Sequence, residues 1–435
     1  MTTMVNVSES RDARTSEEAF RREVIHRHRK HVNKGMARVS DLMGTHIEIR
    51  SAGNYVFDER GERYLDCGGY GVFTIGHCHP AVVKAVTEQL GRLPLSTRSL
   101  VNPEVAAAAE TLSAITPAGL DYVYFGCSGA EATEAGIKLA CLNGRTSLIS
   151  THGGYHGKTL GALSVTGRES YRAPFASLLA PAEFVSFGDV EQMAAALARA
   201  GAKGCVIVEP VQAEGGVIIP PDGYLREVER LCRHHGAFLI LDEIQTGLAR
   251  LGTWWGLERE NVVPDLLLVG KALSGGVVPV SALVASNAAF EKLNQFPILH
   301  TSTFSGNPLA AAAARAAVET IRDENIVLRA RALGDALLTR LDSLRPRHSR
   351  LIRDVRGRGI LIGIEFEADF LAGDFMIEML KKNVVVSYSL NAHRVVRLTP
   401  SALLSEADVQ WLVAAIEASV AILNERYTDF VPEEA

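Results

Sequence analysis

Short runs of apolar residues alternate with helix-compatible stretches between about residues 80 and 320. The runs read DYVYFG, TSLIS, AEFVSFG, GCVIVEP, AFLILDE, DLLLVG and VSALVAS. Strands that are apolar at consecutive positions are typical of parallel sheets, which are buried on both faces. Helices between such strands cover the two faces. The pattern therefore predicts an α/β fold with a large domain built on a mainly parallel sheet.

The two ends of the chain follow another pattern. Residues 15–40 are charged and helix-compatible, and GNYVFDERGERYLD alternates around a polar turn as a β-hairpin does. LIRDVRGRGILIGIEFEA predicts two strands around a glycine-rich turn, and SEADVQWLVAAIEASVAIL predicts a closing helix. We expect a small α+β domain built from both chain ends, with segments 1–75 and 326–435 flanking a large domain at 76–325.

Composition narrows the class of partner. The formal net charge is −5 over 435 residues without a long basic run, which argues against nucleic acid or an anionic membrane as a main partner. The six cysteines are scattered and form no C-x-x-C pair, so neither a zinc site nor a disulfide framework is predicted. The N-terminus shows no apolar signal region, and the apolar stretch 309–318 is too short to span a bilayer. A cytoplasmic protein without a bound metal is expected.

The stretch GGYHGKTLGA, residues 153–162, is similar to a nucleotide phosphate loop but has the wrong spacing. The loop pattern G-x-x-x-x-G-K-[ST] requires a glycine at position 152, which is His152, and Gly153 stands one residue too late. Such a loop surrounds its phosphates with a fixed set of backbone N–H groups. The sequence therefore predicts that phosphate is bound elsewhere.

Three of the predicted strands end in ionisable residues, where open parallel sheets bind their ligands. GCVIVEP ends in Glu209, AFLILDE ends in Asp242 and Glu243, and DLLLVG is followed by Lys271. A lone lysine here is most often a surface residue, and a lone aspartate is a helix cap or a metal ligand. Together, a buried aspartate and a partly desolvated lysine provide what pyridoxal phosphate needs, a partner for its ring nitrogen and an imine-forming amine.

The segment CSGAEATEAGIKLA supplies a candidate phosphate site. Ser128 and Glu131 form the pattern S-x-x-E, which predicts a capping box at the start of a helix. Ser128, Gly129 and Ala130 would then offer a hydroxyl and free backbone N–H groups to an anion. A capping box alone most often only stabilises its helix.

The segments LDEIQTGLARLG and PDLLLVGKALSGG resemble the cofactor-lysine region of class III (ornithine/ω-amino acid) pyridoxal-phosphate-dependent aminotransferases. The resemblance continues over nearly the whole chain, through GHCHPAVVKAV, CSGAEATEAGIKLA, GYHGKTLGALS, VEPVQAEGGV, HTSTFSGNPLA and VRGRGILIGIEF. It implies fold type I, a pyridoxal 5'-phosphate cofactor and a homodimer with shared active sites. GYGVFTIGHCHPAVV and PPDGYLREVERLC are most similar to the branch that acts on putrescine. This implies transfer of a terminal amino group from a diamine to 2-oxoglutarate, giving an amino aldehyde and glutamate.

Carried over residue by residue, the resemblance implies four roles around the cofactor ring. Lys271 holds the cofactor aldehyde as an imine and moves the proton, and Asp242 pairs with the pyridine nitrogen. Gln245 contacts the ring hydroxyl, and Tyr155 stacks on the ring face.

The resemblance also implies residues for the two ends of the site. Ser128, Gly129 and Ala130 hold the phosphate, which Thr303 reaches from the neighbouring subunit. The implied substrate-binding residues are Arg397, which takes the α-carboxylate of glutamate or 2-oxoglutarate, Glu214 and Tyr70. Glu214 neutralises Arg397 when an amine without a carboxylate is bound. Without the resemblance, Arg397 would be interpreted as half of a surface salt bridge.

Several positions depart from the family pattern. Lys158 stands where many ornithine-type members have a substrate-binding arginine, which weakens an ornithine or acetylornithine interpretation. Cys127 and Ala213 replace commoner residues, and no second proline follows Arg397. Two alternatives stay open: a biosynthetic aminotransferase that uses glutamate to aminate an aldehyde or ketone, and a non-catalytic scaffold.

Overall fold

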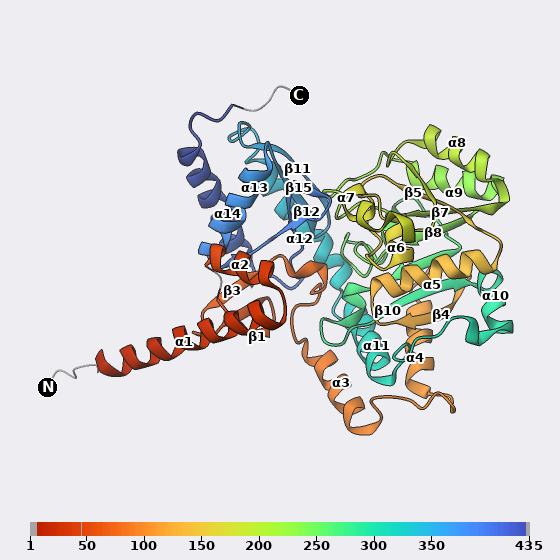
Figure 1. Ribbon diagram of the computed structural model, residues 1–435, viewed down its shortest axis with the longest axis horizontal. Coiled ribbons are helices and arrows are strands. Elements are labelled where there is room, and N and C mark those ends of the chain that lie inside the picture. Colours follow the sequence, from red (N-terminus) through yellow and green to blue (C-terminus); the bar gives the residue numbers. More distant parts are fainter. Residues whose placement is uncertain (1–6, 45, 432–435) are drawn as a thin grey trace.

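The computed structural model describes residues 7–44 and 46–431, arranged as two lobes (Figure 1). The larger lobe contains a seven-stranded sheet, and the smaller lobe contains two four-stranded sheets. The first six and last four residues of the expected domain segments lie outside the described residues.

The seven predicted apolar runs form the seven strands of the large sheet. Six strands run parallel, and β10 is antiparallel to both of its neighbours, β4 and β9. The predicted mainly parallel sheet is therefore confirmed. The strand order is β4 (Leu120–Gly126), β10 (Ser281–Ser286), β9 (Leu266–Val269), β8 (Phe238–Asp242), β7 (Gly204–Val208), β5 (Ser147–Thr151) and β6 (Ala182–Val185).

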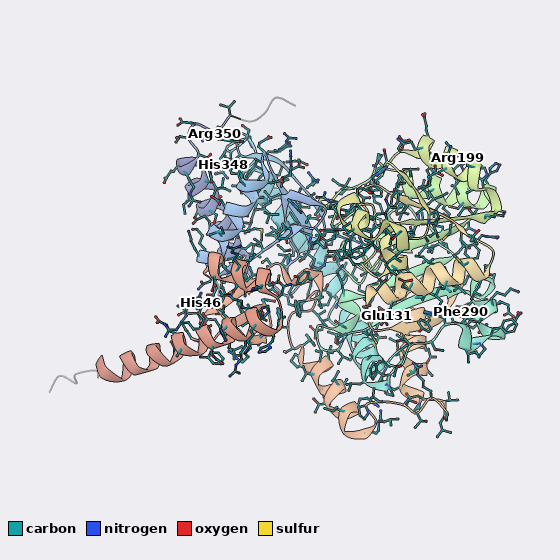
Figure 2. The ribbon with its side chains drawn as sticks, viewed as in Figure 1. His46, Glu131, Arg199, Phe290, His348 and Arg350 are labelled. Atoms are coloured by element: carbon teal, nitrogen blue, oxygen red, sulfur yellow. The ribbon has the colours of Figure 1, made fainter. Side chains whose placement is uncertain are left out.

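Both faces of this sheet are covered, which explains the unbroken apolar runs. In β7, Val206 and Val208 pack into one core, whereas Cys205 and Ile207 face a second core on the opposite side. Successive strand residues point to opposite faces, so each must be apolar when both faces are buried. On the second face, Phe290 of α10 stacks on Tyr122 of β4 with ring centroids 5.1 Å apart (Figure 2).

The helices of the large lobe lie between the strands in sequence. The longest is α11, which packs against α3 and α4. None of the helices in the described part of the chain has the length and apolarity that crossing a bilayer requires. The helices are α3 (Pro80–Arg92), α4 (Pro103–Ser113), α5 (Gly129–Leu142), α6 (Leu160–Val165), α7 (Glu169–Arg172), α8 (Val190–Ala200), α9 (Tyr224–His235), α10 (Asn287–Gln295) and α11 (Pro308–Asp323).

The smaller lobe combines the two chain ends. The predicted hairpin is present as β2 and β3, and β3 continues the sheet by pairing in parallel with β13 from the other end of the chain. The two strands predicted around the glycine-rich turn form the antiparallel pair β11–β12. The strands are β1 (Glu48–Ala52), β2 (Tyr55–Asp58), β3 (Arg63–Asp66), β11 (Ile352–Arg358), β12 (Leu361–Phe366), β13 (Val384–Val385), β14 (Ser387–Ser389) and β15 (Ala392–Leu398).

One apolar core joins Leu65 and Cys67 to buried residues between 337 and 423. We therefore propose that the domain boundaries follow the expected segments 1–75, 76–325 and 326–435. Helix α1 extends away from both lobes at the N-terminal end (Figure 1). The helices of the chain ends are α1 (Val7–His31), α2 (Lys34–Met43), α12 (Ile326–Asp342), α13 (Asp369–Lys381) and α14 (Glu406–Arg426).

The buried side chain of Arg250 in the large lobe forms hydrogen bonds with segments from both ends of the chain. Its guanidinium donates to the carbonyl oxygen of Pro400 at 2.8 Å, to that of Gly71 at 3.1 Å and to Thr74 Oγ1 at 2.8 Å. Burial lowers its pKa to about 9, with a further lowering by Arg397 against the opposite effect of Asp66. A single cation thus holds segments from both chain ends against the large lobe.

Replacing Gly334 by alanine should destabilise the protein, because the added Cβ would lie 2.1 Å from the backbone oxygen of Gly359. Overpacking typically costs about 1–3 kcal/mol. The matched control is Gly373→Ala, since a Cβ at this exposed position on α13 meets nothing within 4 Å. It should stabilise the helix by about 0.5–1 kcal/mol. Equal denaturation midpoints for the two variants would contradict the close approach at Gly334.

Candidate active site

A cavity of about 240 Å³ opens at the carboxyl ends of β7, β8 and β9. Most residues that the sequence singled out line this cavity, although they come from distant parts of the chain. Ser128 lies in an adjoining hollow that shares Gly129 and Lys271. The lining residues are Gly129, Ala130, Tyr155, His156, Gly157, Lys158, Glu209, Glu214, Asp242, Ile244, Gln245 and Lys271.

Lys271 follows β9 after Gly270 and begins a short 3-10 helix. Its φ of 44° lies in the left-handed region, which a lysine rarely adopts. Burial lowers the pKa of its ammonium group, and Arg397 adds to this, whereas Glu214 and Asp242 act in the opposite direction. The partly desolvated lysine that the sequence predicted is therefore present.

Asp242 ends β8 with both carboxylate oxygens engaged. Oδ1 accepts the N–H of Ile244 at 3.0 Å, and Oδ2 lies 2.7 Å from His156 Nδ1. Burial alone would lower the pKa of His156, but the hydrogen bond and charge of Asp242, aided by Glu209, raise it above its usual value. A protonated His156 therefore gives Asp242 a charge-assisted hydrogen bond that holds the carboxylate in place.

Glu209 directly follows β7 and lies almost fully buried in the same cavity. Its Oε1 accepts the N–H of Tyr155 at 3.0 Å, and its Oε2 accepts that of Ala213 at 3.3 Å. Burial raises the pKa of Glu209 to about 7, Asp242 raises it further, and His156 and the backbone donors oppose the change. One carboxyl thus connects the segment before Tyr155 to the segment before Glu214.

The side-chain amide of Gln245 indicates where a ligand binds in the cavity. Its Oε1 and Nε2 atoms are buried, and neither has a hydrogen-bond partner among the described residues. Buried side-chain amides are rarely left in this state, so the pair marks a position for polar atoms of a ligand. Gly71 keeps the space free, because a Cβ there would lie 2.1 Å from Gln245 Nε2.

The expected phosphate end is formed by the start of α5. Ser128 is the N-cap residue, and its Oγ accepts the N–H of Glu131 at 3.3 Å. The predicted capping box is wrong in its second half, because Glu131 Oε2 accepts the N–H of Cys127 and not that of Ser128. The N–H groups of Gly129 and Ala130 remain at the helix start, where an anion is favoured. With Lys271, Asp242 and Gln245 on the same cavity, these residue types fit pyridoxal phosphate.

Arg397 and Glu214 form a buried ion pair at the substrate end. Arg397 Nη1 lies 2.6 Å from Glu214 Oε1, and the side chains are 1% and 6% exposed. Arg397 comes from β15 of the smaller lobe, whereas Glu214 comes from the loop after β7. The surface salt bridge considered from sequence is therefore wrong, since this pair is almost completely desolvated.

Two tyrosine rings lie near Lys158, a residue of the cavity lining. Lys158 Nζ lies 4.0 Å from the ring centroid of Tyr171 and 6.0 Å from that of Tyr155. Burial raises the pKa of Tyr155, with smaller contributions from Glu214, Tyr171 and Tyr70. Tyr70 has a left-handed φ of 51° and is 71% exposed, and it does not line the cavity.

Thr303 is likewise outside the cavity of its own chain, in the exposed segment before α11. Its expected contact with phosphate therefore depends on a second copy of the chain.

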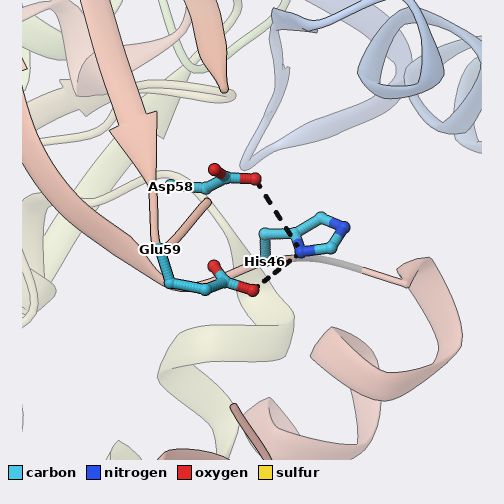
Figure 3. Close-up of side chains that lie close together, drawn as sticks. All are labelled: His46, Asp58 and Glu59. Atoms are coloured by element: carbon cyan, nitrogen blue, oxygen red, sulfur yellow. Dashed lines mark hydrogen bonds and ion pairs between the residues drawn. The ribbon is translucent and has the colours of Figure 1, made fainter. Parts of the chain in front are cut away.

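A separate cluster in the smaller lobe joins His46 to Asp58 and Glu59 (Figure 3). His46 Nδ1 lies 2.9 Å from Glu59 Oε1 and 3.8 Å from Asp58 Oδ2. Glu59 also accepts the N–H of Ile47, and Asp58 is bound by the Arg60 guanidinium. These carboxylates already have donors, so the cluster stabilises the chain near the end of β2 without requiring an ion.

His156 and Arg250 had no predicted role, and Glu209 was expected only as a strand-end carboxylate. His156 stands inside GGYHGKT, and its position next to the predicted Tyr155 could have indicated a role in the site. Its contact with Asp242 spans 86 residues of chain, and Arg250 contacts segments more than 100 residues away on both sides. Neither contact follows from a local pattern.

Glu209→Gln should change how stability depends on pH. The pKa of Glu209 rises from 4.5 to about 7 on folding, so the folded state loses stability as pH increases from 4.5 to about 7. In cofactor-free protein, Glu209→Gln should remove up to roughly 3 kcal/mol of this decrease in the free energy of unfolding. Melting temperatures at pH 5 and pH 8 should therefore differ less in Glu209→Gln than in the parent protein. The exposed substitution Glu191→Gln is the control, and an unchanged pH dependence in Glu209→Gln would contradict the assignment.

Comparisons with known proteins agree with this architecture. Residues 37–420 match the family model described as aminotransferase class-III. The fold is similar to the ornithine aminotransferase from Toxoplasma gondii, with a TM-score of 0.86 and 29% identity over 98% of this chain and 100% of that chain. It is also similar to an (S)-enantioselective ω-transaminase from Thermomicrobium roseum, with a TM-score of 0.84 and 27% identity over 92% and 98% of the respective chains.

An amine transaminase from an uncultivated Pseudomonas species is a further relative, solved with pyridoxal phosphate bound. Its TM-score is 0.80 and its identity is 28%, over 87% of this chain and 95% of that one. These matches favour a catalyst over a non-catalytic scaffold. The chain belongs to the class-III aminotransferases, which are transaminases of fold type I that depend on pyridoxal phosphate.

Proposed function

We propose that this enzyme transfers a terminal amino group from a putrescine-like diamine to 2-oxoglutarate, giving an amino aldehyde and glutamate. The buried pair of Glu214 and Arg397 is the observation that carries the proposal. An arginine that binds only dicarboxylates would need no buried carboxylate partner beside it. A site that also accepts an amine without a nearby carboxylate needs one, because an unpaired buried guanidinium is costly.

The two substrates use the ion pair differently. An amine without a carboxylate leaves Arg397 paired to Glu214. The carboxylate of glutamate or 2-oxoglutarate takes the place of Glu214 on the guanidinium, whose planar donors suit a carboxylate. Tyr70 is proposed to contact the substrate, although its exposed side chain lies outside the cavity lining of a single chain.

When bound, pyridoxal phosphate supplies a reactive aldehyde and an electron-accepting ring. Lys271 holds the cofactor, and its lowered pKa makes Nζ available to take the proton from the amine-bearing carbon of the substrate. Asp242, held by His156, would pair with the ring nitrogen. Gln245 would bind the ring hydroxyl, Tyr155 would lie against the ring, and Ser128, Gly129 and Ala130 would hold the phosphate.

We further propose a cytoplasmic homodimer with shared active sites, in which Thr303 completes the phosphate site of the other copy. Exposed apolar side chains cluster on two segments around Thr303, and Arg98 bonds to the carbonyl oxygen of Ser305 and so joins these segments. Contiguous exposed apolar surface is typical of an interaction site. The exposed residues are Leu95, Leu100, Val101, Phe296, Ile298 and Phe304.

One observation favours a second candidate. The ammonium group of Lys158 lies at the cavity and would repel the second ammonium group of a bound diamine. It suits a substrate whose far end is anionic or uncharged. In this alternative the enzyme works in the biosynthetic direction and uses glutamate to aminate an aldehyde or ketone of that kind.

The visible spectrum of the cofactor-loaded protein tests the proposed donor. Putrescine alone should convert the cofactor to its amine form, with loss of the absorption band of the lysine-bound cofactor. Lys271→Ala should abolish turnover with every donor. If glutamate removes the band and putrescine leaves it unchanged, the second candidate is favoured. Substantial turnover by Lys271→Ala without added amine would contradict the role of Lys271.

Lys158→Met should improve the use of putrescine. A like charge a few ångströms away in a partly hydrated cavity costs on the order of 1 kcal/mol, so the KM for putrescine should fall by roughly five-fold. The KM for n-butylamine, which has no far-end charge, should change little and serves as the internal control. A higher KM for putrescine in Lys158→Met would show that Lys158 supports diamine binding and does not repel the far ammonium group.

A further inference from the structure

The turn between β14 and β15 connects three segments of the active site. We call residues 389–391 the clasp turn. Its backbone donates twice to Glu214: Leu390 N to Oε2 at 2.8 Å, and Asn391 N to the Glu214 carbonyl oxygen at 2.9 Å. Ser389 Oγ donates to the carbonyl oxygen of Ala213 at 3.4 Å. The small lobe thus holds the loop that carries Glu214 through its main chain.

The contact from Leu390 and the contact from Arg397 act on the same carboxylate. Glu214 Oε1 pairs with Arg397 at 2.6 Å, while Oε2 accepts from Leu390. A hydrogen bond from a backbone N–H to a buried carboxylate is among the stronger protein hydrogen bonds. With Oε2 fixed, Oε1 stays directed at the guanidinium. The position of Leu390 therefore determines how firmly Glu214 holds Arg397.

Three side chains outside the cavity lining hold the clasp turn in place. The buried Asn391 donates through Nδ2 to the carbonyl oxygens of Gly153 at 2.9 Å and Gly154 at 3.3 Å. Arg168 Nη1 donates to the carbonyl oxygen of Asn391 at 2.5 Å. Tyr171 adds a third contact, from its hydroxyl to the carbonyl oxygen of Leu390 at 3.0 Å.

We propose that Asn391 and Arg168 are positioning residues that, through the clasp turn, set how Arg397 is shared between Glu214 and the carboxylate of a substrate. The inference rests on the proposed exchange of partners at Arg397. It goes beyond that exchange because it assigns the control of substrate preference to two residues that lie outside the cavity lining.

Loosening the clasp turn should change the affinities for dicarboxylates and for simple amines in opposite directions, which a general loss of structure would not do. Loosening the clasp turn weakens the Glu214–Arg397 pair, so a dicarboxylate displaces Glu214 more easily and binds more tightly. An amine without a carboxylate depends on the intact pair and binds more weakly. A ligand shifts an equilibrium between two states by its differential affinity for them, so the two changes have opposite signs.

The experiment uses the cofactor-loaded enzyme with Asn391→Ala and Arg168→Met. Glutarate, a dicarboxylate without an amino group, is the probe of Arg397, and its Kd is measured by calorimetry. The half-reaction with putrescine, or with n-butylamine if putrescine is not accepted, gives the apparent Kd of the amine. Weakening the Glu214–Arg397 pair by about 1 kcal/mol predicts tighter glutarate binding and weaker amine binding in each variant, so that the ratio of the two affinities changes roughly five-fold.

His393→Ala is the matched control, because His393 is exposed on β15 next to the clasp turn and packs on Tyr388. It should leave both affinities unchanged. Weaker binding of both ligands in Asn391→Ala and Arg168→Met, or no change in either, would overturn the role of the clasp turn.

Glu214→Gln separates this inference from the proposed function. If Glu214→Gln tightens glutarate binding and the clasp variants do not, the exchange at Arg397 stands and the inference is wrong. If Glu214→Gln leaves glutarate binding unchanged, the exchange itself is wrong, and with it the proposed function and the inference.

Discussion

The buried ion pair of Glu214 and Arg397 is the constraint around which the rest of the site is arranged. Its two members come from different lobes, and both are almost inaccessible to water. Removing one partner from such a pair leaves an uncompensated buried charge, which is strongly unfavourable. Fully buried Arg250 increases this constraint, because its positive charge lies near Arg397 and hydrogen-bonds only to neutral acceptors among the described residues. The lobes must therefore meet in a way that satisfies both cations.

Burial also changes the ionisation of the other titratable groups in the cavity. Lys271 has a lowered pKa and Glu209 a raised one, so burial moves both groups toward their neutral forms. Asp242 lies beside His156, whose pKa is raised by the contact. In one cavity, burial makes the Lys271 amine less basic, while the Asp242 carboxylate has His156 as a hydrogen-bond partner. This separation of roles is typical of sites that perform acid–base chemistry.

The sequence predicted the large sheet because burial on both faces makes every strand position apolar, which is a local and strong signal. It also predicted the residues at strand ends, since parallel strands bring their carboxyl ends to one edge. The capping box at Ser128 was half wrong, because Glu131 meets the N–H of Cys127 once the strand before it is in place. The contacts of His156, Arg250 and Asn391 depend on how distant segments pack, so no local pattern indicated them.

A crystal structure of the cofactor-loaded enzyme with glutarate would test the exchange at Arg397 most directly. The proposed exchange predicts a glutarate carboxylate on the Arg397 guanidinium, with Glu214 Oε1 turned away and Oε2 still accepting from Leu390. Glutarate bound elsewhere in the cavity, with the Glu214–Arg397 pair intact, would contradict it.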